Sequence, residues 1–241
     1  MPLPAGIHHL APTLPVHVFV GAESGLTALV QAGIHGDEIA GVHALQELLE
    51  EGLTVAAGRL LVVPTMNVPA YRARQRAAPG GLDLNRCFPG DPTAPERERR
   101  LAARFMELVR DESPALVVTL HESQKRYDPD VDPSFGQTIV YGVRPMPAVV
   151  GRLVDRLNQG IEGESERWAP QYYPVDTSST EVIVDAIGCV GLCIETWMGF
   201  AEDRRVAMHT EVVRILLDEF GIVPAAAGLL GPGAAALASP R

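Results

Sequence analysis

The sequence has few cysteines, no long apolar run and no signal-peptide pattern at its start. Cys87, Cys189 and Cys193 are an odd number in a chain without a secretory leader, which argues against a disulfide framework. Met1–Pro4 lacks the charged and apolar blocks of a signal peptide. No apolar run reaches the roughly 18 residues that a membrane span requires. We therefore expect a cytoplasmic protein with reduced thiols and no membrane partner.

The chain also lacks an excess of positive charge. Its formal net charge is -10 at pH 7, whereas a nucleic-acid-binding protein needs a concentrated basic surface. Nucleic acid is therefore not expected as a partner. Arg72, Arg74, Arg76 and Arg86 nevertheless fall within one short stretch. They form either a local anion-binding site or a set of solvated loop side chains.

Apolar patterns alternate between strand and helix along the chain. Short apolar runs predict strands at 16–20, 26–32, 60–63, 115–120, 137–143 and 190–194. Helical spacing and capping residues predict helices at 39–49, 95–109, 147–158, 179–187 and 204–220. The first two strands are expected to be neighbours or to form a hairpin. The aperiodic segment at 64–94 is typical of a functional loop.

This alternation predicts an α/β fold, a three-layer sandwich with a mixed, largely parallel central sheet covered on both faces. A chain of 241 residues with 46% hydrophobic and 21% charged residues fits one large soluble domain. We expect that domain at residues 1–224. The Ala-, Gly- and Pro-rich segment 225–241 has little to pack and is expected to form a weakly ordered tail.

Polar residues with metal-binding chemistry follow three of the predicted strands. His35 and Glu38 follow the second strand, His121 follows the fourth, and Glu195 follows the last. In proteins with a largely parallel α/β sheet, ligands bind at the carboxyl ends of the strands. Two imidazoles and a carboxylate from His35, Glu38 and His121 would suit zinc. On spacing alone, the alternative to a metal site is that His35 and Glu38 are ordinary polar residues of a loop and a helix start.

A combination of motifs resembles one superfamily. The stretch Gly-Leu-Asp-Leu-Asn-Arg-Cys-Phe-Pro-Gly at 81–90, a histidine at a strand end and Ile-Glu-Thr at 194–196 occur in a characteristic order. Over about residues 26–200, the sequence resembles the zinc metallocarboxypeptidases, most closely their succinylglutamate desuccinylase and aspartoacylase branch. The resemblance implies a zinc carboxypeptidase-like fold and one Zn²⁺ ion per chain. It makes His35, Glu38 and His121 the zinc ligands and Glu195 the general base.

The resemblance also implies a set of substrate contacts. It makes Asn85 and Arg86 the pair that binds the substrate carboxylate. Asp83, two residues before Asn85, is expected to orient their loop. A planar guanidinium and a neighbouring amide donor suit a carboxylate. Arg76 is the match for the arginine that polarises the scissile carbonyl, and Arg74 is the alternative.

Two departures from the family bear on the site. Thr119 stands where the related strand commonly has an aspartate two residues before the histidine, so we expect weaker support of the metal site. The family's usual C-terminal β domain is not expected here, which predicts a more open cleft. Glu122 is either a supporting group or an exposed loop carboxylate, and His43 is expected to be an ordinary helix residue.

These observations predict a zinc-dependent hydrolase that cleaves an amide bond of a small N-acyl amino acid or a related carboxylate substrate. A metal-activated water would attack, with a glutamate as general base. A metallocarboxypeptidase that removes C-terminal residues from peptides is one alternative. An inactive carboxylate-binding module is another.

Overall fold

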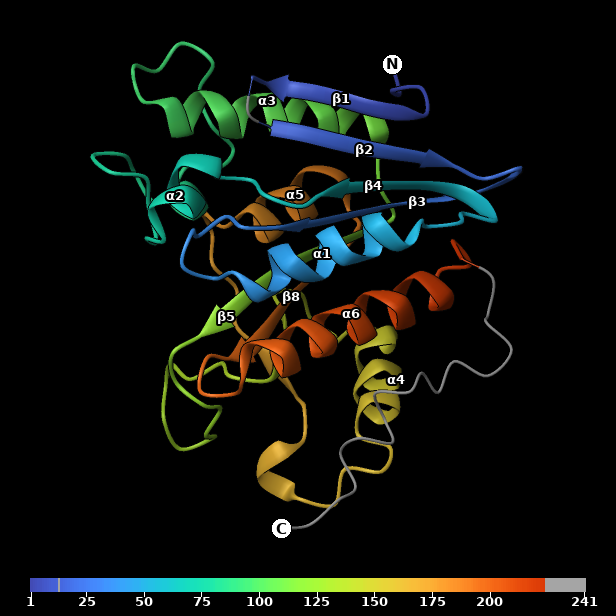
Figure 1. The fold of residues 1–241 in the computed structure, drawn as a ribbon, viewed down its shortest axis with the longest axis vertical. Coiled ribbons are helices and arrows are strands. Elements are labelled where there is room, and N and C mark those ends of the chain that lie inside the picture. Colours follow the sequence, from blue (N-terminus) through green and yellow to red (C-terminus); the bar gives the residue numbers. More distant parts are fainter. Residues whose placement is uncertain (13, 224–241) are drawn as a thin grey trace.

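The computed structural model describes residues 1–12 and 14–223, so the tail predicted at 225–241 lies outside the described residues. Eight strands form one sheet in the order β1-β2-β4-β3-β5-β8-β6-β7 (Figure 1). The strands are β1 (Gly6–Ala11), β2 (Leu14–Val20), β3 (Glu23–Ala32), β4 (Ala57–Val63), β5 (Leu116–Ser123), β6 (Thr138–Tyr141), β7 (Ala169–Tyr172) and β8 (Val190–Trp197). The α-helices are α1 (Ala40–Glu51), α2 (Val68–Ala73), α3 (Arg97–Glu112), α4 (Ala148–Leu157), α5 (Ser179–Ile187) and α6 (Glu202–Glu219).

The four central strands of the sheet are parallel to one another. Strands β4, β3, β5 and β8 form this group, and β2 and β6 join it on either side in the opposite direction. At the edges, β1 pairs antiparallel with β2 and β7 pairs parallel with β6. The central strands read as nearly continuous apolar runs because both of their faces are covered, as is usual for buried parallel strands. The predicted fold class, with its mixed and largely parallel sheet, is confirmed.

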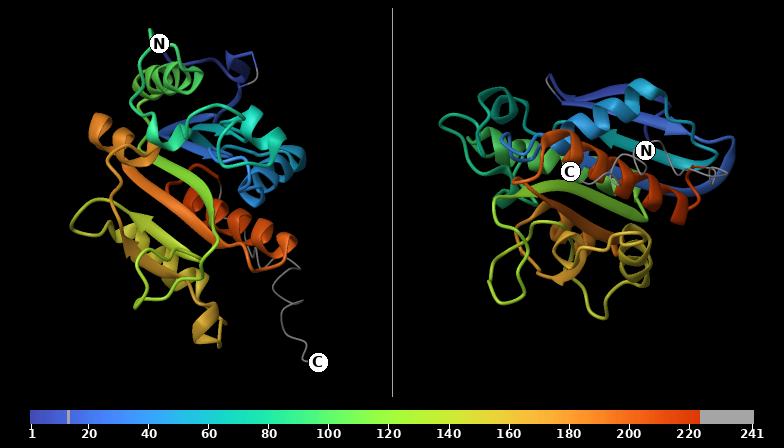
Figure 2. Two further views of the ribbon diagram at one scale, coloured as in Figure 1. Left: turned by 90° about the vertical axis from the view of Figure 1, so that its left-hand side faces the viewer. Right: turned by 60° about the horizontal axis from the view of Figure 1, so that its bottom comes forward.

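Helices cover the sheet on both faces (Figure 2). Helices α1, α4 and α6 bury the larger hydrophobic cluster, which includes Val30, Val118 and Leu120 of the strands. Helices α3 and α5 bury the second cluster on the opposite face, which includes Leu29 and Val117. Successive residues of one strand therefore enter different cores, as the alternation of side chains along a strand requires. Within the described ranges, none of the helices is long and apolar enough to cross a membrane.

The structure corrects several local predictions. Strands β2 and β3 are not paired, because β4 lies between them and pairs with both. The chain reaches this order through the crossover helix α1, the usual connection between parallel strands. Strands β1 and β7 and helix α2 were not predicted. The two strands are exposed sheet edges with little apolar alternation, and α2 has only six residues.

Candidate functional site

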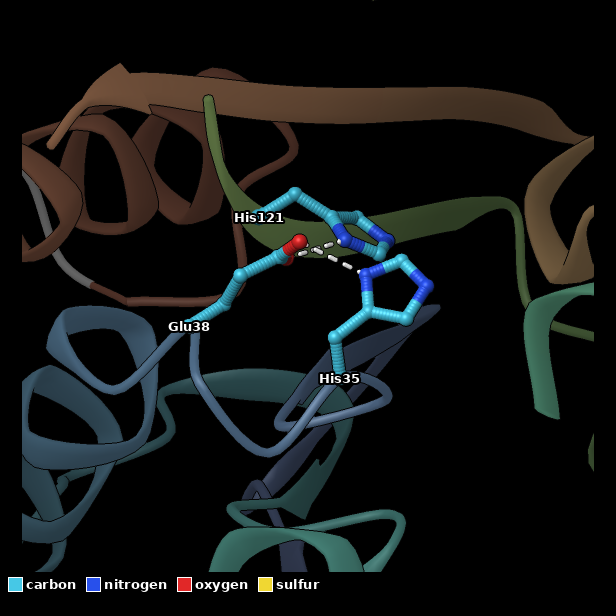
Figure 3. Close-up of side chains that lie close together, drawn as sticks. All are labelled: His35, Glu38 and His121. Atoms are coloured by element: carbon cyan, nitrogen blue, oxygen red, sulfur yellow. Dashed lines mark hydrogen bonds and ion pairs between the residues drawn. The ribbon is translucent and has the colours of Figure 1, made fainter. Parts of the chain in front are cut away.

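Three predicted ligands meet beyond the carboxyl end of β3 and beside the end of β5 (Figure 3). Glu38 Oε1 lies 2.7 Å from His35 Nδ1, and Glu38 Oε2 lies 2.6 Å from His121 Nδ1. The two imidazole rings are 5.0 Å apart between centroids. One ligand atom from each residue lies within 4.8 Å of the others, and all three residues are buried.

Two glycines shape the loop that carries His35 and Glu38. Gly33 turns the chain after β3 with a φ of 64°, a left-handed conformation that favours glycine. At Gly36 the backbone meets α2 so closely that a Cβ atom would lie 1.9 Å from the carbonyl carbon of Ala70. The loop after β3 is therefore fixed against α2, which places His35 and Glu38 at the strand end.

Glu38 is a buried carboxylate that is held ionised between two imidazoles. Burial opposes the charged form of His35, but the charge of Glu38 and hydrogen bonds with Asp83 and Glu38 raise the pKa of His35 to about 9. Burial likewise opposes ionisation of Glu38, yet His35 and His121 hold its pKa well below the usual range. An ionised carboxylate with two imidazoles against it is a donor set that zinc accepts. The residues present therefore fit a zinc ion.

Asp83 connects this group to Arg76. Its Oδ1 accepts a hydrogen bond from His35 Nε2 at 3.2 Å, and its Oδ2 accepts from Arg76 Nε at 3.0 Å. Burial opposes its charged form, but the contacts with His35 and Arg76 hold the pKa of Asp83 well below the usual range. A carboxylate on the far nitrogen of a ligand imidazole fixes the orientation of the ring. Asp83 thus orients His35 as well as its own loop.

The structure separates the alternating arginines. Arg76 Nη1 lies 3.8 Å from Glu38 Oε1, and its guanidinium is half exposed beside the ligand group. Arg74 turns instead to Tyr71, with its guanidinium 4.6 Å from the ring centroid. Arg72 is an exposed residue of α2. Of the three, Arg76 is therefore the arginine placed beside the predicted metal ligands.

The predicted carboxylate-binding pair lies on a short turn that packs against α5. Asn85 Oδ1 accepts a hydrogen bond from the backbone N–H of Ser179 at 3.0 Å, while the Asn85 backbone N–H donates to Asp83 Oδ1 at 2.9 Å. The amide oxygen of Asn85 is thereby directed toward α5. Arg86 is exposed, and its guanidinium donates to the Asn85 carbonyl at 3.0 Å.

Glu195 lies on β8 directly opposite His121 on β5 in the parallel register. The side chains of both residues therefore emerge on the same face of the sheet. Cys193 Sγ lies 3.8 Å from Glu195 Oε1 and donates toward it. Burial and the nearby charge of Glu38 raise the pKa of Glu195 well above its usual range. This placement brings the predicted base beside the predicted ligands.

Thr119 belongs to a buried neutral network that the sequence analysis missed. Gln31 Nε2 donates to Thr119 Oγ1 at 2.9 Å and to Ser179 Oγ at 3.1 Å, and Thr119 also contacts Thr180 Oγ1 at 3.0 Å. Thr119 therefore joins β3 and β5 to the start of α5, the helix that receives Asn85. The available signal was Gln31 itself, a polar residue within an apolar strand run.

The structure also shows where Glu122 and His43 lie. Glu122 is buried rather than exposed, and its carboxylate contacts the Arg205 side chain and the Ala40 backbone. His43 is a helix residue, as expected. Its ring nitrogens lie 2.9 Å from Glu202 Oε1 and 3.0 Å from Tyr71 Oη.

Comparison with known proteins shows which family the segment around this site resembles. Residues 24–127 match the model of the family described as the succinylglutamate desuccinylase/aspartoacylase catalytic domain. The matched segment contains His35, Glu38, His121 and the motif at 81–90, whereas Glu195 lies beyond it. This match confirms the resemblance to the succinylglutamate desuccinylase/aspartoacylase branch of the zinc carboxypeptidase-like superfamily that the sequence shows.

Individual relatives share only part of their length with this chain. N-alpha-acetyl-L-2,4-diaminobutyric acid deacetylase of Halomonas elongata is 39% identical over 117 residues, which make up 48% of this chain and 33% of that protein. The tripeptide-bound cell shape determinant Csd4 of Helicobacter pylori shares the fold, with a TM-score of 0.75 and 19% identity over 87% of this chain and 56% of that chain. The product-bound ectoine utilization protein of Ruegeria pomeroyi has a TM-score of 0.66 and 26% identity, over 87% of this chain and 61% of that chain. The chain thus spans about a third of the curated relative and 56% to 61% of these solved chains.

Proposed function

We propose that this protein is a zinc-dependent hydrolase that cleaves an amide bond of a small N-acyl amino acid or a related carboxylate substrate. The observation that carries the proposal is the convergence of His35, Glu38 and His121 at one buried point, with Glu195 opposite His121 in the sheet register. Those three residues would hold the ion. Zinc, when bound, supplies Lewis acidity that polarises a carbonyl oxygen and lowers the pKa of water.

Glu195 transfers protons during the reaction, and Arg76 stabilises the negative charge that develops. The Glu195 carboxylate takes a proton from the attacking water and delivers it to the leaving amine. The Arg76 guanidinium lies beside the ligand group and stabilises the oxyanion that develops on the scissile carbonyl. Asp83 holds that guanidinium by two contacts, of 3.0 and 2.9 Å, and so orients it.

Asn85 and Arg86 bind the free carboxylate of the substrate. Arg86 presents an exposed planar fork, and the NH₂ group of Asn85 is a second donor beside it. Because Ser179 occupies the amide oxygen of Asn85, the side chain is fixed by α5 and loses little freedom on binding.

The relatives favour an N-acyl amino acid as the substrate class. The Halomonas elongata relative is named as a deacetylase of an N-acetylated diamino acid. A carboxypeptidase is the second candidate, because the Helicobacter pylori neighbour was solved with a bound tripeptide. Both reactions require an amide carbonyl at the metal and a free carboxylate nearby.

A hydrolysis screen distinguishes these candidates. We expect the zinc-loaded protein to release amine from small N-acyl amino acids, including acetylated diamino acids, faster than it releases C-terminal residues from short peptides. Amine release is followed by a colorimetric or mass-spectrometric assay. Faster turnover of peptides would establish the carboxypeptidase candidate. No turnover of either class by protein that has bound zinc would contradict the hydrolase proposal.

Arg86→Ala tests the carboxylate-binding role. We expect KM for a substrate with a free carboxylate to rise by about ten- to two-hundredfold, the range of a lost charge-assisted hydrogen bond worth 1.5–3 kcal/mol. Steady-state kinetics on a substrate and on its carboxamide analogue provide the measurement. Arg110→Ala, which removes the same charge from an exposed position on α3, is the matched control. An equal loss on both substrates would argue against a carboxylate contact.

A further inference from the structure

Glu122 points away from the active-site face of the sheet. Side chains alternate along β5, so Glu122 enters the opposite layer from its neighbour His121. There it lies beneath the first turns of α1 and α6, with its side chain fully buried. It is a buried carboxylate that the proposed reaction does not use, which calls for a separate explanation.

The contacts of Glu122 join both segments that carry the proposed metal ligands. Its Oε2 accepts a hydrogen bond from the backbone N–H of Ala40 at 2.8 Å, two residues after Glu38. Its own backbone N–H donates to Glu38 Oε2 at 3.2 Å. Arg205 of α6 makes an ion pair with the other carboxylate oxygen, Oε1. One residue thus connects the loop of Glu38, the strand of His121 and a third element.

We propose that the Glu122 and Arg205 pair is a positioning device that holds Glu38 and His121 at the separation that the metal requires. The inference rests on the proposed metal site and extends it to the opposite layer of the sheet. Glu122 fixes the start of α1 through Ala40, while Arg205 fixes Glu122 from α6. Neither residue touches the substrate.

A role in stability alone does not account for this pair. Transferring two charges from water to the interior is unfavourable, and well-packed apolar residues are often as stabilising as a buried ion pair. The charged pair instead fixes the orientation of the Glu122 carboxylate, because an amide and a guanidinium that both donate to it allow only one geometry. Outer partners of metal ligands typically affect metal affinity by about 10–100-fold. We expect an effect of that size here.

The test compares zinc affinity among variants of the full chain by chelator competition. Glu122→Gln and Arg205→Met are each expected to weaken zinc binding by about 10–100-fold. The double variant is expected to lose little more than either single variant, because two groups that act as one unit are not additive. If Glu122→Gln does not fold, Arg205→Met and the milder Arg205→Lys provide the comparison.

Thr196→Val is the matched control. Thr196 lies opposite Glu122 in the sheet register, and its Oγ1 contacts His209 Nε2 at 3.1 Å in the same buried layer. Burial lowers the pKa of His209 to about 3, so this contact is neutral at pH 7. The variant should lower the melting temperature yet keep zinc affinity within about twofold. Equal zinc affinity in the Glu122 and Thr196 variants would overturn the proposal.

Hydrogen exchange of the zinc-free protein separates this proposal from the metal site itself. Glu122→Gln should accelerate amide exchange in a peptide that spans residues 34–45, because the Ala40 amide loses its charged acceptor. Thr196→Val should not. Unchanged exchange in Glu122→Gln would overturn the positioning role whether or not zinc binds. Failure of the unmodified protein to bind zinc would instead contradict the proposed function.

Discussion

Replacing Glu195 by glutamine is expected to abolish most hydrolysis while zinc binding remains. The substitution keeps the size of the side chain but removes the group that accepts the proton of water and returns it to the leaving amine. General acid and base catalysis of this kind contributes about 10²–10⁴-fold. We therefore expect kcat to fall by about that factor, with KM nearly unchanged. Steady-state kinetics and zinc content, measured on the same preparation, test both parts.

Glu47→Gln is the control for this experiment. Glu47 is an exposed residue of α1, so the same change of functional group there should leave kcat and zinc content unaltered. If Glu195→Gln kept nearly full activity, Glu195 would not be the base. If it lost zinc together with activity, its role would lie in building the metal site.

Replacing His121 by alanine is expected to remove zinc binding and activity together. The substitution deletes one of three donors, so zinc affinity should fall by more than the 10–100-fold typical of an outer partner. It also removes the imidazole that lies 2.6 Å from Glu38 Oε2 and leaves that buried carboxylate with one fewer partner. Destabilisation is therefore expected as well. Zinc titration with chelator competition and thermal unfolding measure the two effects.

His43→Ala provides the comparison for the His121 variant. His43 is a partly buried histidine of α1 that contacts Glu202 and Tyr71 rather than the proposed ligands. Its loss should leave zinc affinity within about twofold. Equal zinc affinity in His121→Ala and in the unmodified protein would remove His121 from the ligand set.

The sequence was most informative where one local pattern determines one local structure. Apolar runs marked the central strands, and the helix at 179–187 was predicted with the bounds that α5 has. His35, Glu38 and His121 were identified because their chemistry coincides with strand ends, and the family motif added Asn85 and Arg86. These inferences depend on neighbours in the chain, or on a known combination of residues.

Strand order and burial depend on tertiary packing and could not be predicted in this way. The insertion of β4 between β2 and β3 is a choice among alternative pairings of similar apolar strands. In the sequence, Glu122 cannot be distinguished from an exposed loop carboxylate. In the structure, α1 and α6 cover it. The buried network of Thr119 also depends on tertiary packing. Only the register of β3 and β5 places Thr119 beside Gln31.

The proposed function requires that His35, Glu38 and His121 bind one catalytic metal ion. Elemental analysis of the purified protein, before and after incubation with zinc and removal of the excess by dialysis, tests it most directly. The proposal predicts about one zinc per chain, together with loss of this zinc in His121→Ala and retention in Glu195→Gln. A chain that stays free of zinc after incubation would contradict it.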